Sequence, residues 1–165
     1  MQTQVLASLN AGSGISVFTG HSSIHQWGIE NFFHIDQVAS LSNSLRFPLI
    51  IEATCFTSYF QMPDLSALDE AFVRYSNGGA ISSWGPSGLC LSDGHLILVE
   101  GFMDEIFHNG ERNLGQAIQA GRINLATKAP YYSALIDTQT LLGDPAISLF
   151  NSSESEFSFL PLISR

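Results

Sequence analysis

The sequence predicts a three-layer α/β domain with a mainly parallel sheet. Short apolar runs alternate along the chain with longer segments of helical periodicity, as in parallel strands joined by helical crossovers. The run "PLIIEAT" at 48–54 is almost continuously apolar, which is typical of a strand that is covered on both faces. Three later segments, 63–79, 95–108 and 114–128, carry apolar residues at helical spacing.

The composition indicates a folded domain and excludes two classes of partner. Of the 165 residues, 45% are apolar and 13% are charged, which allows a core and is unlike a disordered chain. The formal net charge of −9 predicts a surface that repels nucleic acid and anionic membranes. No run of about 18 apolar residues occurs, so we expect no membrane span. Residues 1–14 lack the regions of a signal peptide.

The first third of the chain predicts two strands with mixed structure between them. A weak helix at 2–10 ends at a glycine-rich stretch, and the β-prone run "ISVFTG" follows at 15–20. A polar loop is expected at 21–28 and a modest amphipathic helix at 33–42. The second strand is the apolar run at 48–54.

The remainder predicts helices separated by one strand and turns. In the segment 63–79, Asp64 or Ser66 is the expected N-cap of a helix, and the two glycines at its end stop it. The other expected elements are a strand at 80–84, a turn-rich loop at 85–94, the helices at 95–108 and 114–128, a turn into a late strand at 141–150, and a tail or extra strand at 151–165.

Three side chains follow or end successive predicted strands. His21 follows the first strand, Cys55 follows the second, and Trp84 ends the third. In open α/β sheets, ligands bind beyond the carboxyl ends of the strands. We therefore expect these three residues on one rim, where Trp84 is either a pocket wall or a core residue.

A thiol and an imidazole on one rim suit nucleophilic chemistry. The thiolate is the attacking species, and a neighbouring histidine can take its proton and later protonate the leaving amine. A tetrahedral intermediate also needs hydrogen-bond donors for its oxyanion. The backbone N–H groups of Cys55 and Ser22 are the expected donors.

Four motifs in order resemble the gingipain-type cysteine peptidases, which have a caspase-like fold. They are "VFTGHSSIHQW", "PLIIEATCFTSYF", "SALDEAFVRYSNGGAISSWGPSG" and "LLGDPAISLF", and together they span roughly residues 12–150. The resemblance implies that His21 is the general base and acid, that Cys55 is the nucleophile, and that peptide bonds are the substrate. It also implies an exported protein, extracellular or periplasmic.

The resemblance also sets expectations for the domain and its pocket. Residues 1–150 should form a partial caspase-like peptidase domain that lacks the N-terminal strands, which in the family carry a third catalytic acid and part of the specificity pocket. Serine at position 22 replaces the second glycine of the family's Gly-His-Gly-Ser loop. The expected substrate-contacting residues are Trp84, Gly85, Pro86 and Ser87. No metal or cofactor is needed for the chemistry, and no motif for the family's structural calcium occurs.

Several alternatives stay open on the sequence. The chain is alternatively an inactive remnant, or an interaction module that completes a sheet with another chain. A thiol-redox protein would form a bridge between Cys55 and Cys90. A zinc site would use His21, His25 and His34. Cys55 on its own also fits a buried structural thiol.

Overall fold

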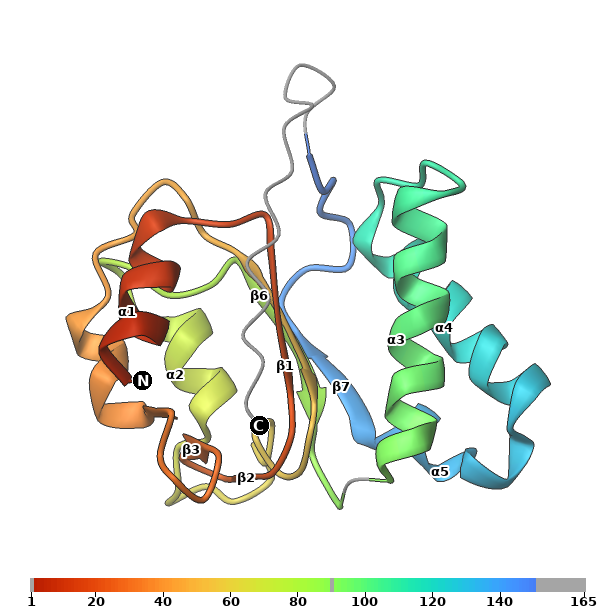
Figure 1. The fold of residues 1–165 in the computed structure, drawn as a ribbon, viewed down its shortest axis with the longest axis horizontal. Coiled ribbons are helices and arrows are strands. Elements are labelled where there is room, and N and C mark those ends of the chain that lie inside the picture. Colours follow the sequence, from red (N-terminus) through yellow and green to blue (C-terminus); the bar gives the residue numbers. More distant parts are fainter. Residues whose placement is uncertain (1, 90, 151–165) are drawn as a thin grey trace.

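The computed structural model describes residues 2–89 and 91–150. A central sheet lies between two layers of helices (Figure 1), so the predicted three-layer α/β class is confirmed. No helix in these ranges has the length and apolar character needed to cross a bilayer. The tail or strand expected at 151–165 lies outside the described residues, as does Cys90.

Four strands form the main sheet in the order β1-β5-β6-β7. They are β1 (Ile15–Thr19), β5 (Leu49–Ala53), β6 (Ser82–Pro86) and β7 (Gln139–Leu142). The first three run parallel, and β7 runs antiparallel to β6. Every residue of β5 is buried, as its apolar sequence and central position require.

One face of the sheet is covered by three helical segments. These are α1 (Gln2–Ala11), the 3-10 helix η1 (Ile35–Ser40) and α2 (Leu68–Arg74). Their apolar side chains pack with Ile50 of β5. The buried residues of this layer are Val5, Leu9, Trp27, Phe33, Val38, Leu41, Ile50, Leu68, Phe72 and Ala80.

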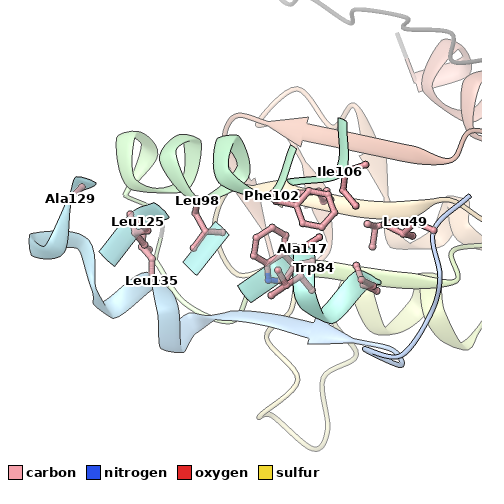
Figure 2. Packing of buried hydrophobic residues seen from close by; sticks show 13 residues of the cluster. Leu49, Trp84, Leu98, Phe102, Ile106, Ala117, Leu125, Ala129 and Leu135 are labelled. Atoms are coloured by element: carbon pink, nitrogen blue, oxygen red, sulfur yellow. The ribbon is translucent and has the colours of Figure 1, made fainter. Parts of the chain in front are cut away.

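The other face is covered by a pair of long helices, α3 (Ser92–Phe107) and α4 (Leu114–Lys128). Short helices η2 (Pro130–Tyr132) and α5 (Ala134–Thr138) then lead into β7. Figure 2 shows the core of this layer, in which side chains of the sheet pack against α3 and α4. The helices approach closely at Gly121, where a Cβ atom would lie 2.5 Å from the carbonyl oxygen of Leu98.

A small antiparallel sheet follows β1, where the sequence predicted a loop and then a helix. It consists of β2 (Ser22–Ser23), β3 (Gln26–Trp27) and β4 (Phe33–His34). The helix expected at 33–42 is therefore wrong at both ends: residues 33–34 form β4, residues 35–40 are 3-10 rather than α-helical, and residues 41–42 are not helical. The buried rings of Trp27 and Phe33 pack into the core. The backbones of these two residues lie opposite each other in the antiparallel pair of β3 and β4.

Helix α2 begins later than the sequence indicated, because tertiary contacts use its first N–H groups. Its N-cap is Ala67 rather than Asp64 or Ser66. The N–H of Leu68 donates to the carbonyl of Ile24 at 2.8 Å, and the N–H of Asp69 donates to the carbonyl of Thr57 at 3.1 Å. The first turn of α2 is therefore fixed by Ile24 and Thr57, and the residues before Ala67 stay in the loop that follows β5.

The last two strands also differ from the predicted boundaries. β6 ends at Pro86 instead of residue 84, since its backbone goes on pairing with β7 up to that point. β7 precedes the Gly-Asp-Pro turn rather than following it. The carboxylate of Asp144 accepts the N–H of Ala146 at 2.8 Å within this turn.

Candidate active site

The ends of β1 and β5 bring His21 and Cys55 to the same rim of the sheet. Thr19 is opposite Ala53 in the parallel register, so both strands leave the sheet at one level. The hydroxyl of Thr54 then donates to the carbonyl of Gly20 at 2.7 Å. His21 follows that carbonyl and is exposed, whereas Cys55 is partly buried.

Ser22 links the two strand ends through its side chain. The backbone N–H of Cys55 donates to Ser22 Oγ at 2.9 Å, and the Ser22 hydroxyl donates to the carbonyl of Cys55. The Thr54 hydroxyl lies 2.5 Å from the same Ser22 oxygen. Non-glycine residues with positive φ in the described ranges are Asn31, Leu45, Phe56 and Phe150, so Ser22 holds this contact without left-handed strain.

The loop after Cys55 is bound to the segment that follows β6. Phe56 turns the chain with a φ of 60°, and its N–H donates to the carbonyl of Gly88 at 2.9 Å. Ser58 N–H donates to the carbonyl of Pro86 at 3.0 Å, and the Gln61 amide donates to the carbonyl of Ser87 at 3.0 Å. The loop that carries Cys55 is thus attached to the end of β6 on one side and, through Ser22, to β2 on the other.

Trp84 does not emerge at this rim, so the prediction that its side chain walls a pocket is wrong. It pairs with Ile51 in the middle of the sheet and is 0% exposed. Its ring packs on Phe102 with centroids 5.4 Å apart (Figure 2). The physical reason is the longer β6, which moves the strand end two residues further along the chain.

Of the other expected pocket residues, Gly85 and Pro86 are buried strand residues. Ser87 is partly exposed, and its N–H and hydroxyl both donate to the carbonyl of Thr138, at 2.8 and 3.0 Å. Ser87 is therefore the member of that set with accessible surface at the rim.

The sequence of residues 1–150 matches the model of Peptidase family C25. The chain belongs to this family. A search of curated proteins found no match.

Solved structures agree on the fold. The chain is similar to the complex of Porphyromonas gingivalis RgpB pro- and mature domains, with 20% identity and a TM-score of 0.81 over 90% of its length. It is also similar to the Arg specific cysteine proteinase gingipain R (RGPB), with 21% identity and a TM-score of 0.78, again over 90% of its length. It spans 37% of the first of these chains and 36% of the second. The expected gingipain-type resemblance is confirmed, as is its limitation to part of the domain.

This C25 chain also contains two buried acids that were not predicted from the sequence, one on strand β5 and one on helix α2. Glu52 of β5 and Asp69 of α2 are both 0% exposed. Glu52 accepts hydrogen bonds from the indole N–H of Trp27 and, at 2.8 Å, from the hydroxyl of Thr57. Asp69 accepts from the hydroxyl of Ser58. The two carboxyl groups therefore hold Thr57 and Ser58, the two residues that directly follow Phe56.

Gly85 makes room for the two carboxyl groups to meet. A Cβ atom at this position would lie 2.2 Å from Asp69 Oδ2 and 2.6 Å from Glu52 Oε2. The described ion pairs involve other residues, so no lysine or arginine within residues 2–89 and 91–150 neutralises the pair. The signal in the sequence was a glutamate inside an apolar strand, because a charged residue is rarely fully buried unless it is paired.

The environment favours one shared proton on this pair. Burial raises the pKa of Glu52 well above its usual range, and the nearby charge of Asp69 raises it further. Burial also raises the pKa of Asp69, although hydrogen bonds from Glu52 and Ser58 oppose that rise. We therefore assign the proton to Glu52, which donates it to the Asp69 carboxylate.

This proton predicts a pH dependence of stability. Because the pKa of Glu52 is higher folded than unfolded, the folded state binds more protons above the unfolded pKa of about 4.3, and the free energy of unfolding falls as pH rises. The Glu52→Gln variant should show a smaller fall between about pH 5 and pH 8. Urea unfolding at a series of pH values measures this slope.

The control for this measurement is Glu30→Gln, which changes an exposed carboxylate. It should keep the slope of the original chain. An unchanged slope in Glu52→Gln would contradict the assignment of the proton to Glu52.

The zinc alternative has no support in the part of the chain that the structure describes. The rings of His25 and His34 lie with centroids 6.3 Å apart. Among the described residues, no group of three or more histidine, cysteine, aspartate or glutamate side chains is placed to hold a metal ion.

Proposed function

We propose that this chain carries the nucleophile of a cysteine endopeptidase, with Cys55 and His21 as its catalytic dyad. The observation that carries the proposal is the rim geometry, in which paired strand ends bring the segments of His21 and Cys55 together in a chain of Peptidase family C25. The neighbouring structure described as a cysteine proteinase is consistent with it. Because the chain spans about 37% of those proteins, the activity stays a proposal.

In the proposed reaction, His21 takes the proton of the Cys55 thiol, and the sulfur attacks the scissile carbonyl carbon. The carbonyl oxygen becomes an oxyanion that accepts from backbone N–H groups of Cys55 and Ser22. The intermediate then breaks the C–N bond, and His21 gives its proton to the leaving amine. Water, deprotonated by His21, hydrolyses the thioester and regenerates the thiol.

A peptidyl chloromethyl ketone tests this proposal. Its carbon forms a thioether with the attacking sulfur and chloride leaves, so intact mass reports the adduct. The original chain should be labelled, and Cys55→Ala should lose the adduct. His21→Ala should slow labelling about 100-fold or more, since general base catalysis contributes on the order of 10² to 10⁴.

Cys90→Ala is the matched control, because it removes the other thiol of the chain. It should be labelled at the original rate. Equal labelling of the original chain and Cys55→Ala, or no labelling of either, would contradict the peptidase proposal.

A second candidate function is an interaction module that completes a sheet with another chain. It is favoured by β1, which is an edge strand of the main sheet among the described residues and has Val17 at 47% exposure. The neighbouring structure of pro- and mature domains is itself a complex. Sedimentation velocity over a concentration series tests this candidate, which predicts assembly together with no Cys55-dependent labelling.

A further inference from the structure

The hydroxyl oxygen of Ser22 accepts a hydrogen bond from the backbone N–H of Cys55, the proposed nucleophile. The N–H of Cys55 points to Ser22 Oγ at 2.9 Å, while the Ser22 proton is used on the carbonyl of Cys55. A hydroxyl has one proton and two lone pairs, so it can donate to the carbonyl and accept from the N–H at the same time. The contact joins two residues that are 33 positions apart.

The surrounding structure holds Ser22 in this place. Its backbone pairs with Trp27 of β3, and Trp27 is 5% exposed. The Trp27 ring stacks on Phe18 with centroids 4.9 Å apart, and its indole N–H is bound to Glu52. The backbone of Ser22 is therefore attached to the core, and rotation about its Cα–Cβ bond is the motion that would release the Cys55 N–H.

We propose that Ser22 is a latch on the oxyanion site: its hydroxyl takes the Cys55 N–H in the resting chain, and an acyl substrate must displace it. The inference rests on the proposed peptidase function, because it concerns the oxyanion formed when Cys55 attacks a carbonyl. Donors must lie about 2.7–3.1 Å from that oxygen to stabilise it. The N–H of Cys55 can take this role only after its bond to Ser22 breaks.

The latch predicts that removal of the hydroxyl accelerates acyl transfer. The net contribution of one hydrogen bond in water corresponds to about a threefold to tenfold change in an equilibrium. Ser22→Ala and Ser22→Gly should therefore increase the rate of Cys55 acylation by about threefold to tenfold.

Two reagents separate the oxyanion from the thiol itself. With p-nitrophenyl acetate, the sulfur adds to the carbonyl carbon, an oxyanion forms, and p-nitrophenolate leaves. With iodoacetamide, the sulfur displaces iodide directly and no oxyanion forms. In chains that carry Cys90→Ala, Cys55 is the remaining thiol, so both rates report on it. The latch predicts faster acylation with an unchanged alkylation rate.

Ser23→Ala is the matched control, because this exposed neighbouring hydroxyl contacts the N–H of His25 rather than Cys55. It should leave both rates unchanged. Melting temperatures confirm that each variant is folded, and Ser22→Gly provides a second removal of the hydroxyl if Ser22→Ala unfolds.

The outcomes distinguish the latch from the proposed function. If the original chain acylates faster than a free cysteine amide but Ser22→Ala is equal or slower, the latch is wrong and the peptidase proposal stands. An equal rise in both rates also overturns the latch, since it reports a more accessible thiol. If no variant acylates faster than the free thiol while alkylation proceeds, both proposals are overturned.

Discussion

Replacement of Glu52 by leucine should lower the free energy of unfolding by about 3–5 kcal/mol. The substitution removes the acceptor of the Trp27 indole N–H and of the Thr57 hydroxyl, and it removes the proton donor to Asp69. All of these groups lie in a region without solvent, where a polar group that loses its partner costs about 1–3 kcal/mol. Urea unfolding at neutral pH measures the change.

A second substitution on the same pair tests the cause. Asp69→Asn removes the carboxylate that Glu52→Leu leaves without its partner, so the double variant should recover part of the lost stability. Glu30→Leu changes an exposed acid and should stay within about 0.5 kcal/mol of the original chain. A loss below about 1 kcal/mol in Glu52→Leu would contradict a closed network around this carboxyl group.

Trp84→Ala should lower the free energy of unfolding by a similar amount, about 3–5 kcal/mol. The ring is 0% exposed and fills the space between the sheet and the helix pair α3 and α4. Its contact with Phe102 would be replaced by a cavity, because the packed helices can close over it only in part. Thermal unfolding of the purified variant measures this loss.

Trp84→Phe separates packing from any contact with substrate. The indole N–H of Trp84 is buried and has no hydrogen-bond partner among the described residues. Phenylalanine removes that unsatisfied donor, and this gain offsets part of the stability lost with the smaller ring. We therefore expect the free energy of unfolding to fall by about 1 kcal/mol. Labelling of Cys55 by the chloromethyl ketone should be unchanged, and a large decrease in a folded Trp84→Phe chain would restore the pocket-wall interpretation.

Local patterns predicted those parts of the fold that depend on neighbouring residues along the chain. The apolar run at 48–54 indicated a covered central strand, and all of β5 is buried. Apolar spacing predicted α4 with its correct bounds, and in the structure Asn113 accepts the N–H of Gln116 at 2.9 Å as its N-cap. The positions of His21 and Cys55 followed from the predicted strands at 15–20 and 48–54, since the carboxyl ends of neighbouring parallel strands lie at one edge of the sheet.

Other features depend on partners that are distant in the sequence, and local patterns could not indicate them. Two-residue strands such as β2 carry no periodicity, so the small sheet was missed. The start of α2 depends on the carbonyls of Ile24 and Thr57, which replace the expected cap. β6 continues past Trp84 because β7 pairs with it from the far end of the chain.

The sequence by itself determined the α/β class, the family and the rim that carries Cys55, because apolar patterns and the order of motifs can be seen along the chain without knowledge of its packing. Only the tertiary structure decided which groups surround that cysteine. It brought Ser22 onto the Cys55 backbone and placed Asp69 against Glu52 across Gly85. The physical reason is that hydrogen bonds and shared protons depend on distances between segments, and those distances exist only once the strands and helices have packed.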